Sequence, residues 1–220
     1  MARKHYDKTY VFAEMPVGKA VAYLVVPTVL TQIISILYNL ADTYFIGQVG
    51  DPALVAAVGV CLPPMMLLTA LANLFGVGAS SVISRSLGSG DEKSAKKAAA
   101  FAIWVGITVA LVYIVATSVL RDPLVDVIGG AGEPHAHVVV YLTWAFTIGG
   151  LFFFLTGLLA HLLRSMSKSV EASIGVAVGS VVNIALDPVL IFGAGWGIRG
   201  AAVATLVGQV SSVALLLWYL

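Results

Sequence analysis

The chain has 220 residues, of which 60% are apolar and 10% are charged, whereas a soluble domain usually carries about 25% charged residues. So few charges cannot cover a water-soluble globule, and the mean hydropathy of +0.99 agrees that the solvent is largely lipid. One cysteine excludes a disulfide scaffold, and a net charge of +1 argues against a nucleic-acid-binding protein, which needs a basic face. The sequence is that of an integral membrane protein.

Long apolar runs predict an all-α fold, a bundle of six transmembrane helices. About 20 apolar residues cross a hydrocarbon core about 30 Å thick as a helix. Barrel strands would need alternating stretches of about 10 residues, and these runs are continuous. The second run is long enough to be kinked at Pro63-Pro64. A segment over residues 1–16 precedes a six-helix lobe over 17–220, with spans at about 18–47, 53–84, 95–120, 134–163, 170–193 and 200–220.

The positions of Lys and Arg predict how these spans are oriented. With six spans, both termini and the loops after the second and fourth spans share one side of the membrane. That side holds ten of the twelve cations, namely Arg3, Lys4, Lys8, Lys19, Arg85, Lys93, Lys96, Lys97, Arg164 and Lys168. Only Arg121 and Arg199 fall on the other side. We expect a multi-pass protein of the cytoplasmic (inner) membrane with both termini in the cytoplasm.

The first predicted span carries an acidic residue, Asp42, well inside the apolar run. A charge at the bilayer centre costs at least about 2.5–3.5 kcal/mol, so such residues are candidates for function. Gln32, Ser35 and Asn39 precede Asp42 at spacings of 3, 4 and 3 residues, which places all four on one helix face. This polar stripe predicts a lining for a site between helices.

The fifth and sixth predicted spans carry matching polar residues. Asn183 and Asp187 are four residues apart and therefore share one face. Pro188 follows at once and leaves the carbonyl of Ile184 without its helical donor. Thr205 begins a third polar stripe in the last span. If these spans pack against the first one, their oxygen atoms surround a common pocket.

Carboxylate, amide, hydroxyl and free carbonyl oxygens are ligands of a hard cation, and a buried carboxylate without a cation takes up a proton instead. Such a pocket holds one positive charge reversibly, as a coupling site must. The alternative is that Asp42 and Asp187 only hydrogen-bond to neighbouring helices. The sequence shows no nucleophile–base pair, phosphate loop or zinc spacing, so it gives no support for an enzyme.

Several runs of the sequence resemble the multidrug and toxic compound extrusion (MATE) transporters, especially their archaeal and DNA-damage-inducible branch. The resemblance extends from about residue 18 to 220. The runs that carry it are Pro27, Gln32 and Tyr38-Asn39-Leu40-Ala41-Asp42, then Gly76-Val77-Gly78-Ala79-Ser80-Ser81, Asn183-Ile184-Ala185-Leu186-Asp187-Pro188 and Gly200-Ala201-Ala202-Val203-Ala204-Thr205. Arg164-Ser165-Met166-Ser167-Lys168 departs from the family's frequent Arg-Gly-x-Gly-Asp turn.

The resemblance implies a cation-coupled antiporter that exports drug-like, amphipathic or cationic compounds. Its coupling ion is Na⁺ or H⁺, and it needs no other cofactor. The residues that match the family's cation site, and would be the metal ligands for Na⁺, are Asp42, Asn183, Asp187 and Thr205. The residues expected to shape the pocket are Gln32, Asn39, Pro188 and Pro27.

The length of the chain matches one of the two six-helix lobes that the family combines into twelve helices. We expect its partner to be a second lobe, either the C-terminal half of a longer chain, which the apolar end at Leu220 favours, or a second copy in a homodimer. Two other functions remain open. One is a lipid-linked-sugar flippase of the same superfamily, and the other is a membrane interaction module that transports nothing.

Overall fold

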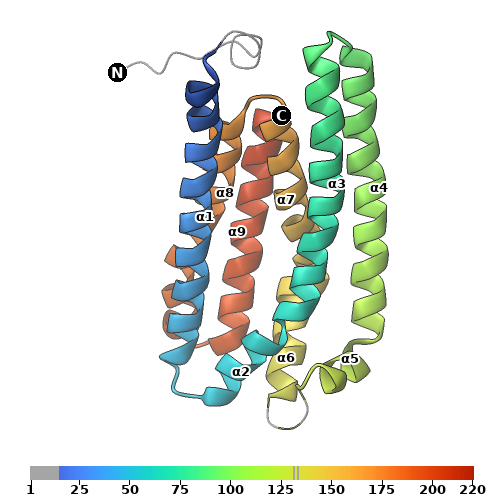
Figure 1. Ribbon diagram of the computed structural model, residues 1–220. Coiled ribbons are helices and arrows are strands. Elements are labelled where there is room, and N and C mark those ends of the chain that lie inside the picture. Colours follow the sequence, from blue (N-terminus) through green and yellow to red (C-terminus); the bar gives the residue numbers. More distant parts are fainter. Residues whose placement is uncertain (1–14, 131, 133) are drawn as a thin grey trace.

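The computed structural model describes residues 15–130, 132 and 134–220, and within them the chain is a bundle of helices without a strand (Figure 1). Most of the predicted segment 1–16, with Arg3, Lys4 and Lys8, lies outside these residues. The helices are α1 (Val17–Gly47), α2 (Pro52–Val60), α3 (Leu62–Gly88), α4 (Glu92–Val119), α5 (Arg121–Val127), α6 (His135–Tyr141), α7 (Gly150–Ser165), α8 (Ser169–Pro188) and α9 (Gly197–Tyr219), with π-helical segments η2 (Leu142–Ile148) and η3 (Val189–Gly193).

Six stretches of the described chain are long and apolar enough to cross a membrane. Five are α1, α2 with α3, α4, α8 with η3, and α9. The sixth is α6 with η2 followed by α7, a pair bent by 49°. Because α1 begins and α9 ends at the same end of the bundle (Figure 1), the number of crossings is even. The expected all-α bundle of six membrane-spanning helices is confirmed.

The second span is interrupted at Cys61, two residues before the proline pair at which the sequence suggests a kink. α2 ends at Val60 and α3 begins at Leu62. Pro63 and Pro64 lie in the first turn of α3, where helix N–H groups have no intrahelical acceptor and proline is tolerated. Because proline has no N–H, these two residues leave the carbonyls one turn earlier without helical donors. The interruption of the helix therefore lies before the prolines and not at them.

The fourth span contains a bend that apolar periodicity does not reveal. Gly149 donates its N–H to the carbonyl of Trp144, five residues back, so the helix widens to π geometry just before the bend. A Cβ at this position would lie 2.7 Å from the carbonyl oxygen of Ala145. Only glycine fits there, and it marks the junction between η2 and α7.

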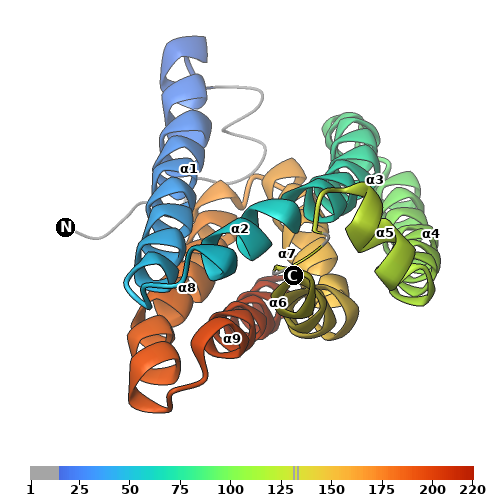
Figure 2. The same ribbon diagram turned by 90° about the horizontal axis from the view of Figure 1, so that it is seen from below.

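The helices form two groups with α7 between them, as Figures 1 and 2 show. On one side α8 packs closely on α9, with α1 against α8. On the other side α3 packs on α4. Phe154 and Leu158 of α7 are fully buried in the core, as is Leu68 of α3. α1 is the least covered span, since most of its side chains are exposed.

Glycines bring α8 and α9 into close contact. A Cβ on Gly179 of α8 would lie 2.5 Å from the carbonyl oxygen of Gly208 and would overlap the hydroxyl of Ser212, both on α9. A Cβ on Gly208 would in turn meet the carbonyl oxygen of Gly179 at 2.7 Å. Small residues at such contacts let helix backbones approach each other, and here they align the two helices that carry Asn183 and Thr205.

We therefore expect Gly179→Ala to force α8 and α9 apart and to destabilise the bundle by about 1–3 kcal/mol, the usual effect of overpacking. The measurement is the melting temperature of the detergent-purified protein, which should fall by several degrees. Gly78→Ala is the matched control, because a Cβ at this helical position of α3 meets nothing within 4 Å. Equal melting temperatures for the two variants would contradict the close contact.

Candidate functional site

Three helices bring together the four residues that the sequence singles out for cation binding. Asp42 comes from α1, Asn183 and Asp187 from α8, and Thr205 from α9. All four are buried, with 5% of Asp42 and 0% of Asp187 exposed. The Nδ2 group of Asn183 donates a hydrogen bond to Oγ1 of Thr205 at 3.3 Å. The two carboxylates lie close enough for their charges to interact.

Most of the oxygen atoms in this cluster have no hydrogen-bond donor within the described chain. Oδ1 of Asp42, Oδ1 of Asn183 and both carboxylate oxygens of Asp187 are buried without a partner, as is Oε1 of Gln209 on α9. Leaving a buried acceptor unsatisfied costs about 1–3 kcal/mol, and more when it is charged. Several acceptors without donors therefore form a site that favours a bound cation or proton.

The chemistry of this donor set fits a hard cation. It combines carboxylate, amide and hydroxyl oxygens, which suit ions such as Na⁺ rather than soft transition metals. Within the described residues no group of three or more His, Cys, Asp or Glu side chains is placed to hold a metal. The two acids therefore depend on Asn183 and Thr205 to complete any coordination.

Two tyrosines join the cluster. The phenol groups of Tyr38 on α1 and Tyr141 on α6 both interact with the Thr205 side chain and lie within electrostatic range of Asp42. From sequence, Tyr38 stands out only as part of the run 38–42 that resembles MATE transporters, and Tyr141 does not stand out at all, because a single tyrosine in an apolar span looks like core. A buried phenol hydroxyl usually needs a polar partner, which is the only signal that could have singled out Tyr141.

Three other predicted residues lie away from the cluster. Gln32 and Asn39 are on an exposed face of α1, and Asn39 donates its amide to the carbonyl of Ser35 at 2.7 Å. Pro27 lines a separate apolar groove of about 240 Å³ between α1 and α8. It is fifteen residues from Asp42, which is about 22 Å along a helix. The structure therefore does not bring these residues to the four buried ones.

Pro188 does border the cluster, directly after Asp187. It ends α8, and η3 continues the chain with π geometry, in which Ala194 donates its N–H to the carbonyl of Val189. A proline has no N–H to give to the residue one turn back, so the regular ladder is lost here. The irregular backbone therefore begins at the residue beside the buried carboxylate.

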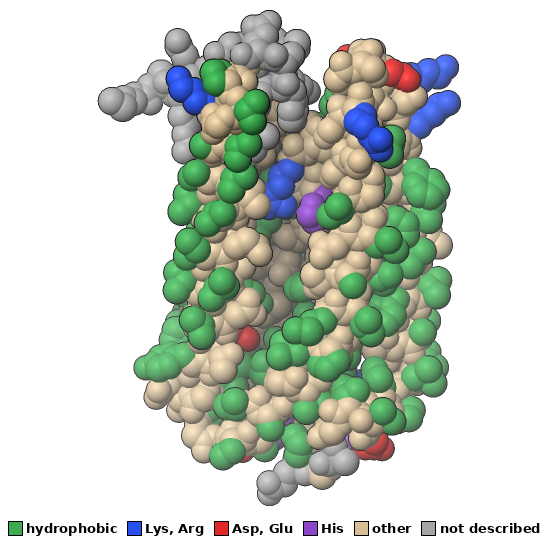
Figure 3. All heavy atoms as spheres, viewed as in Figure 1, with side chains coloured by type: hydrophobic (Ala, Val, Ile, Leu, Met, Phe, Trp, Pro, Cys, Tyr) green, Lys and Arg blue, Asp and Glu red, His purple; other side chains and the backbone are tan. Residues whose placement is uncertain are grey.

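A hollow opens on the face between α1 and α3, and basic and histidine side chains lie in its upper part (Figure 3). α7, behind this face (Figure 1), carries two polar residues one turn apart. Nε2 of His161 lies 3.0 Å from Oδ1 of Asn73. Nε of Arg164 is buried and has no partner in the described chain.

The turn that follows Arg164 contains the residues that depart from the Arg-Gly-x-Gly-Asp pattern. Ser167 has a φ of +62°, a left-handed conformation that favours glycine. It stands where the Arg-Gly-x-Gly-Asp turn has its second glycine, so a serine here adopts a conformation that glycine adopts more readily. Lys168, in place of the aspartate, donates to the carbonyl of Tyr219 and ties this turn to the end of α9.

The chain is similar to known membrane transporters along most of its length. The MatE family model matches residues 27–189. The multidrug export protein MepA of Staphylococcus aureus (strain NCTC 8325 / PS 47) is 32% identical over 213 residues, which are 97% of this chain and 47% of that protein. MepA of Staphylococcus saprophyticus is 30% identical over 215 residues. The chain spans about half the length of these relatives.

Solved structures show the same half-length relationship. A MATE protein crystallised with MaD3S superposes with a TM-score of 0.89 at 27% identity, covering 96% of this chain and 47% of that one. A MOP superfamily transporter from Pyrococcus furiosus superposes with a TM-score of 0.82 at 28% identity, covering 99% of this chain and 48% of its own. The bundle described above is therefore similar to half of such a transporter.

The unpartnered oxygens predict an effect of Asp187→Asn on stability. The new amide supplies donors to neighbouring acceptors and removes one of two interacting buried charges, so we expect a gain of about 1–3 kcal/mol. The measurement is the melting temperature in sodium-free buffer at pH 8, which should rise by several degrees.

Asp122→Asn is the matched control for this change. The Asp122 carboxylate is 66% exposed and, in the described part of the chain, pairs with the neighbouring Arg121, so its replacement should change stability by less than about 0.5 kcal/mol. If Asp187→Asn melted below the native protein, the Asp187 carboxylate would already be satisfied and the site would have another purpose.

Proposed function

The chain belongs to the MatE family, and from this we propose that it is one six-helix lobe of a cation-coupled antiporter that exports drug-like or toxic organic compounds. The resemblance of residues 38–42 and 183–188 to MATE transporters is confirmed by the family match. The coupling ion in this proposal is Na⁺ or H⁺. The second lobe is either the other half of a longer chain or a second copy of this one.

The observation that carries the proposal is the buried group of unpartnered oxygens on Asp42, Asn183 and Asp187. Acidic groups inside a membrane are expensive and mark ion or proton pathways. Their position supports coupling as well. Asp42 lies five residues, or about 8 Å, before the end of α1, in the half of the bundle remote from the end that carries most of the Lys and Arg residues. In the proposed orientation that half faces away from the cytoplasm, so an ion that enters from the non-cytoplasmic side has the shorter path to the cluster.

Each residue of the cluster has its own part in this proposal. Asp42 carries the exchanged cation or proton, and Asp187 supplies the second carboxylate. The amide nitrogen of Asn183 is engaged with Thr205, which leaves the amide oxygen free to serve as a ligand. Pro188 begins the irregular backbone next to the site. Because α1 is held mainly by α8, a change of charge between Asp42 and Asp187 acts directly on the contact between these two helices.

The hollow between α1 and α3 is the proposed path for the substrate (Figure 3). The multidrug exporter MepA, to which the chain is similar, supports an organic compound as the cargo. One charge crossing 100 mV releases about 2.3 kcal/mol, enough for a roughly fifty-fold concentration ratio of an exported compound. Alternating access requires a second bundle that moves against this one around the site.

Asp42→Asn tests the coupling role in the complete transporter. We expect it to remove the dependence of efflux on an imposed Na⁺ or pH gradient, because an amide cannot exchange a positive charge. The measurement is efflux of a fluorescent organic cation from proteoliposomes under each gradient. Asp122→Asn should retain native efflux. Gradient-driven efflux by Asp42→Asn would exclude Asp42 as the carrier, and no gradient dependence in the native protein would favour an interaction module.

The proposed orientation has its own test, which uses the buried position of Cys61. This cysteine is 1% exposed, so the native protein should react little with a membrane-impermeant maleimide. With both termini in the cytoplasm, Asp122→Cys should be labelled in intact cells, and Ser89→Cys, in the exposed turn before α4, only after permeabilisation. The reverse labelling pattern would contradict the orientation.

A further inference from the structure

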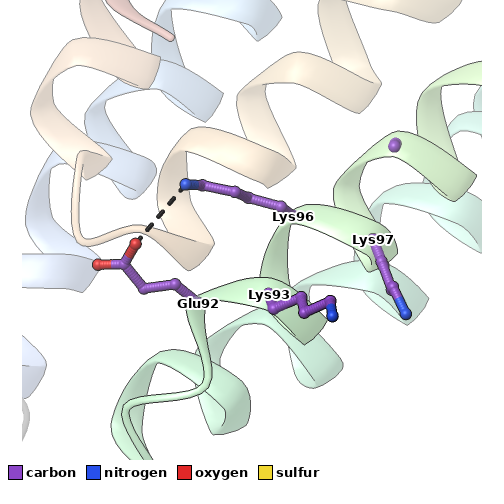
Figure 4. A pocket seen from close by; sticks show the side chains of 5 residues that line it. Glu92, Lys93, Lys96 and Lys97 are labelled. Carbon is purple, nitrogen blue, oxygen red and sulfur yellow. Dashed lines mark ion pairs between the residues drawn. The ribbon is translucent and has the colours of Figure 1, made fainter.

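The first turns of α4 form a basic surface at the same end of the bundle as the start of α1. Lys93, Lys96 and Lys97 are all exposed there. Nζ of Lys96 lies 3.6 Å from Oε2 of Glu92, one turn before it. Figure 4 shows Lys96 reaching toward Glu92, whereas Lys93 and Lys97 both point away from this pair. Lys93 and Lys97 thus extend to a common side, and among residues 15–130, 132 and 134–220 neither forms an ion pair.

An open pocket of about 530 Å³ lies beside these lysines, lined by them, Glu92 and Ala100. Lys93 and Lys97 are four residues apart, so they are neighbours on one helix face. Ala100 follows on the same face, and its small side chain keeps the space below the two ammonium groups open. The pocket therefore presents two cations above a short apolar floor.

Aromatic side chains continue this face deeper along α4. Trp104 is 71% exposed and Phe101 is 63% exposed. Trp104 lies seven residues after Lys97, which is two helical turns, or about 10 Å, further along the same face. Exposed tryptophans of this kind sit at the level of lipid headgroups in membrane proteins. Below them the face is aliphatic, with Leu111 and Val115 exposed.

In the described chain the acidic residue Asp91 at the start of α4 is hydrogen-bonded to the helix end and forms no ion pair with the two lysines. Its carboxylate accepts the backbone N–H of Ser94 at 3.0 Å and so caps the helix. The side-chain and backbone hydrogen bonds from Ser94 hold the pKa of Asp91 below its usual range, so it stays ionised and engaged with the helix end. Glu92 is engaged with Lys96. Lys93 and Lys97 are the cations left for a ligand.

We propose that this face of α4 binds an anionic phospholipid, with the phosphate between Lys93 and Lys97 and the glycerol and acyl region against Ala100, Phe101 and Trp104. The order of chemistry along the face, from cationic to small to aromatic to aliphatic, is the order of a phospholipid from headgroup to tail. A soluble phosphate would use only the first of these levels. The proposal needs the chain to lie in a bilayer but does not depend on transport.

Quenching of Trp104 fluorescence tests this site. The full-length protein is reconstituted into nanodiscs in which brominated phosphatidylglycerol or brominated phosphatidylcholine replaces part of the lipid, and Trp104→Phe identifies the Trp104 signal among the four tryptophans. We expect phosphatidylglycerol to quench Trp104 at a lower fraction of lipid than phosphatidylcholine. Equal quenching by the two lipids would overturn the proposal.

Lysine variants test which residues cause the preference for phosphatidylglycerol. Lys93→Gln and Lys97→Gln should each weaken the apparent affinity for phosphatidylglycerol about fivefold, and the double variant about 30-fold. Lys19→Gln is the matched control, because it removes an exposed lysine at the same end of the bundle but on α1. An equal loss in Lys19→Gln would mean a general surface potential and would contradict a site on α4. Full displacement of the lipid effect by millimolar inorganic phosphate would assign the pocket to a soluble anion instead.

Discussion

Two carboxylates inside an apolar bundle impose the condition that the rest of the lobe has to meet. Asp42 and Asp187 are almost fully buried and interact with each other, so the negative charge of each raises the free-energy cost of ionising the other. Backbone N–H donors around the two carboxylates would remove this cost permanently, and the carboxylates would then have no need of a bound cation or proton. The cluster instead supplies further acceptors from Asn183 and Thr205. Such an environment favours a cation or a proton within it, which in the proposed antiporter is what makes the site respond to an ion.

The close packing of α8 on α9 is what brings these acceptors together. Gly179 and Gly208 allow the two backbones to approach, and a Cβ on Gly208 would also crowd the Cβ of Asn183 at 3.1 Å. The hydrogen bond from Asn183 to Thr205 therefore depends on glycines that carry no polar group. The glycine contact between α8 and α9 therefore sets the distance between these two helices, and that distance allows the polar residues of the site to reach each other.

The sequence was sufficient to predict that Asp42, Asn183, Asp187 and Thr205 face a common space, because helical spacing applies to residues on one span and the cost of charge in lipid singles out the two acids. It was insufficient where the packing of neighbouring helices determines which side chains are buried. The stripe on α1 was extended to Gln32 and Asn39, yet α1 is covered mainly by α8, so a residue slightly further round the helix is exposed. Tyr141 was missed because one phenol in an apolar run carries no periodic signal. The bend before α7 follows from a π turn at Gly149 that periodicity does not encode.

The least covered helix, α1, also carries Asp42, the most exposed of the four buried residues at 5%, and this combination has a mechanical consequence. α1 contributes Asp42 but packs mainly on α8, while α7, α8 and α9 all pack on one another and Phe154 and Leu158 of α7 are fully buried. A dense core resists small displacements, whereas a helix held along one side gives way at lower cost. In the proposed antiporter, a change of charge at the cluster would therefore move α1 relative to α8 before it altered the rest of the lobe. The hollow between α1 and α3 is bounded by that same helix (Figure 3), so movement of α1 would affect both the proposed ion site and the proposed substrate path.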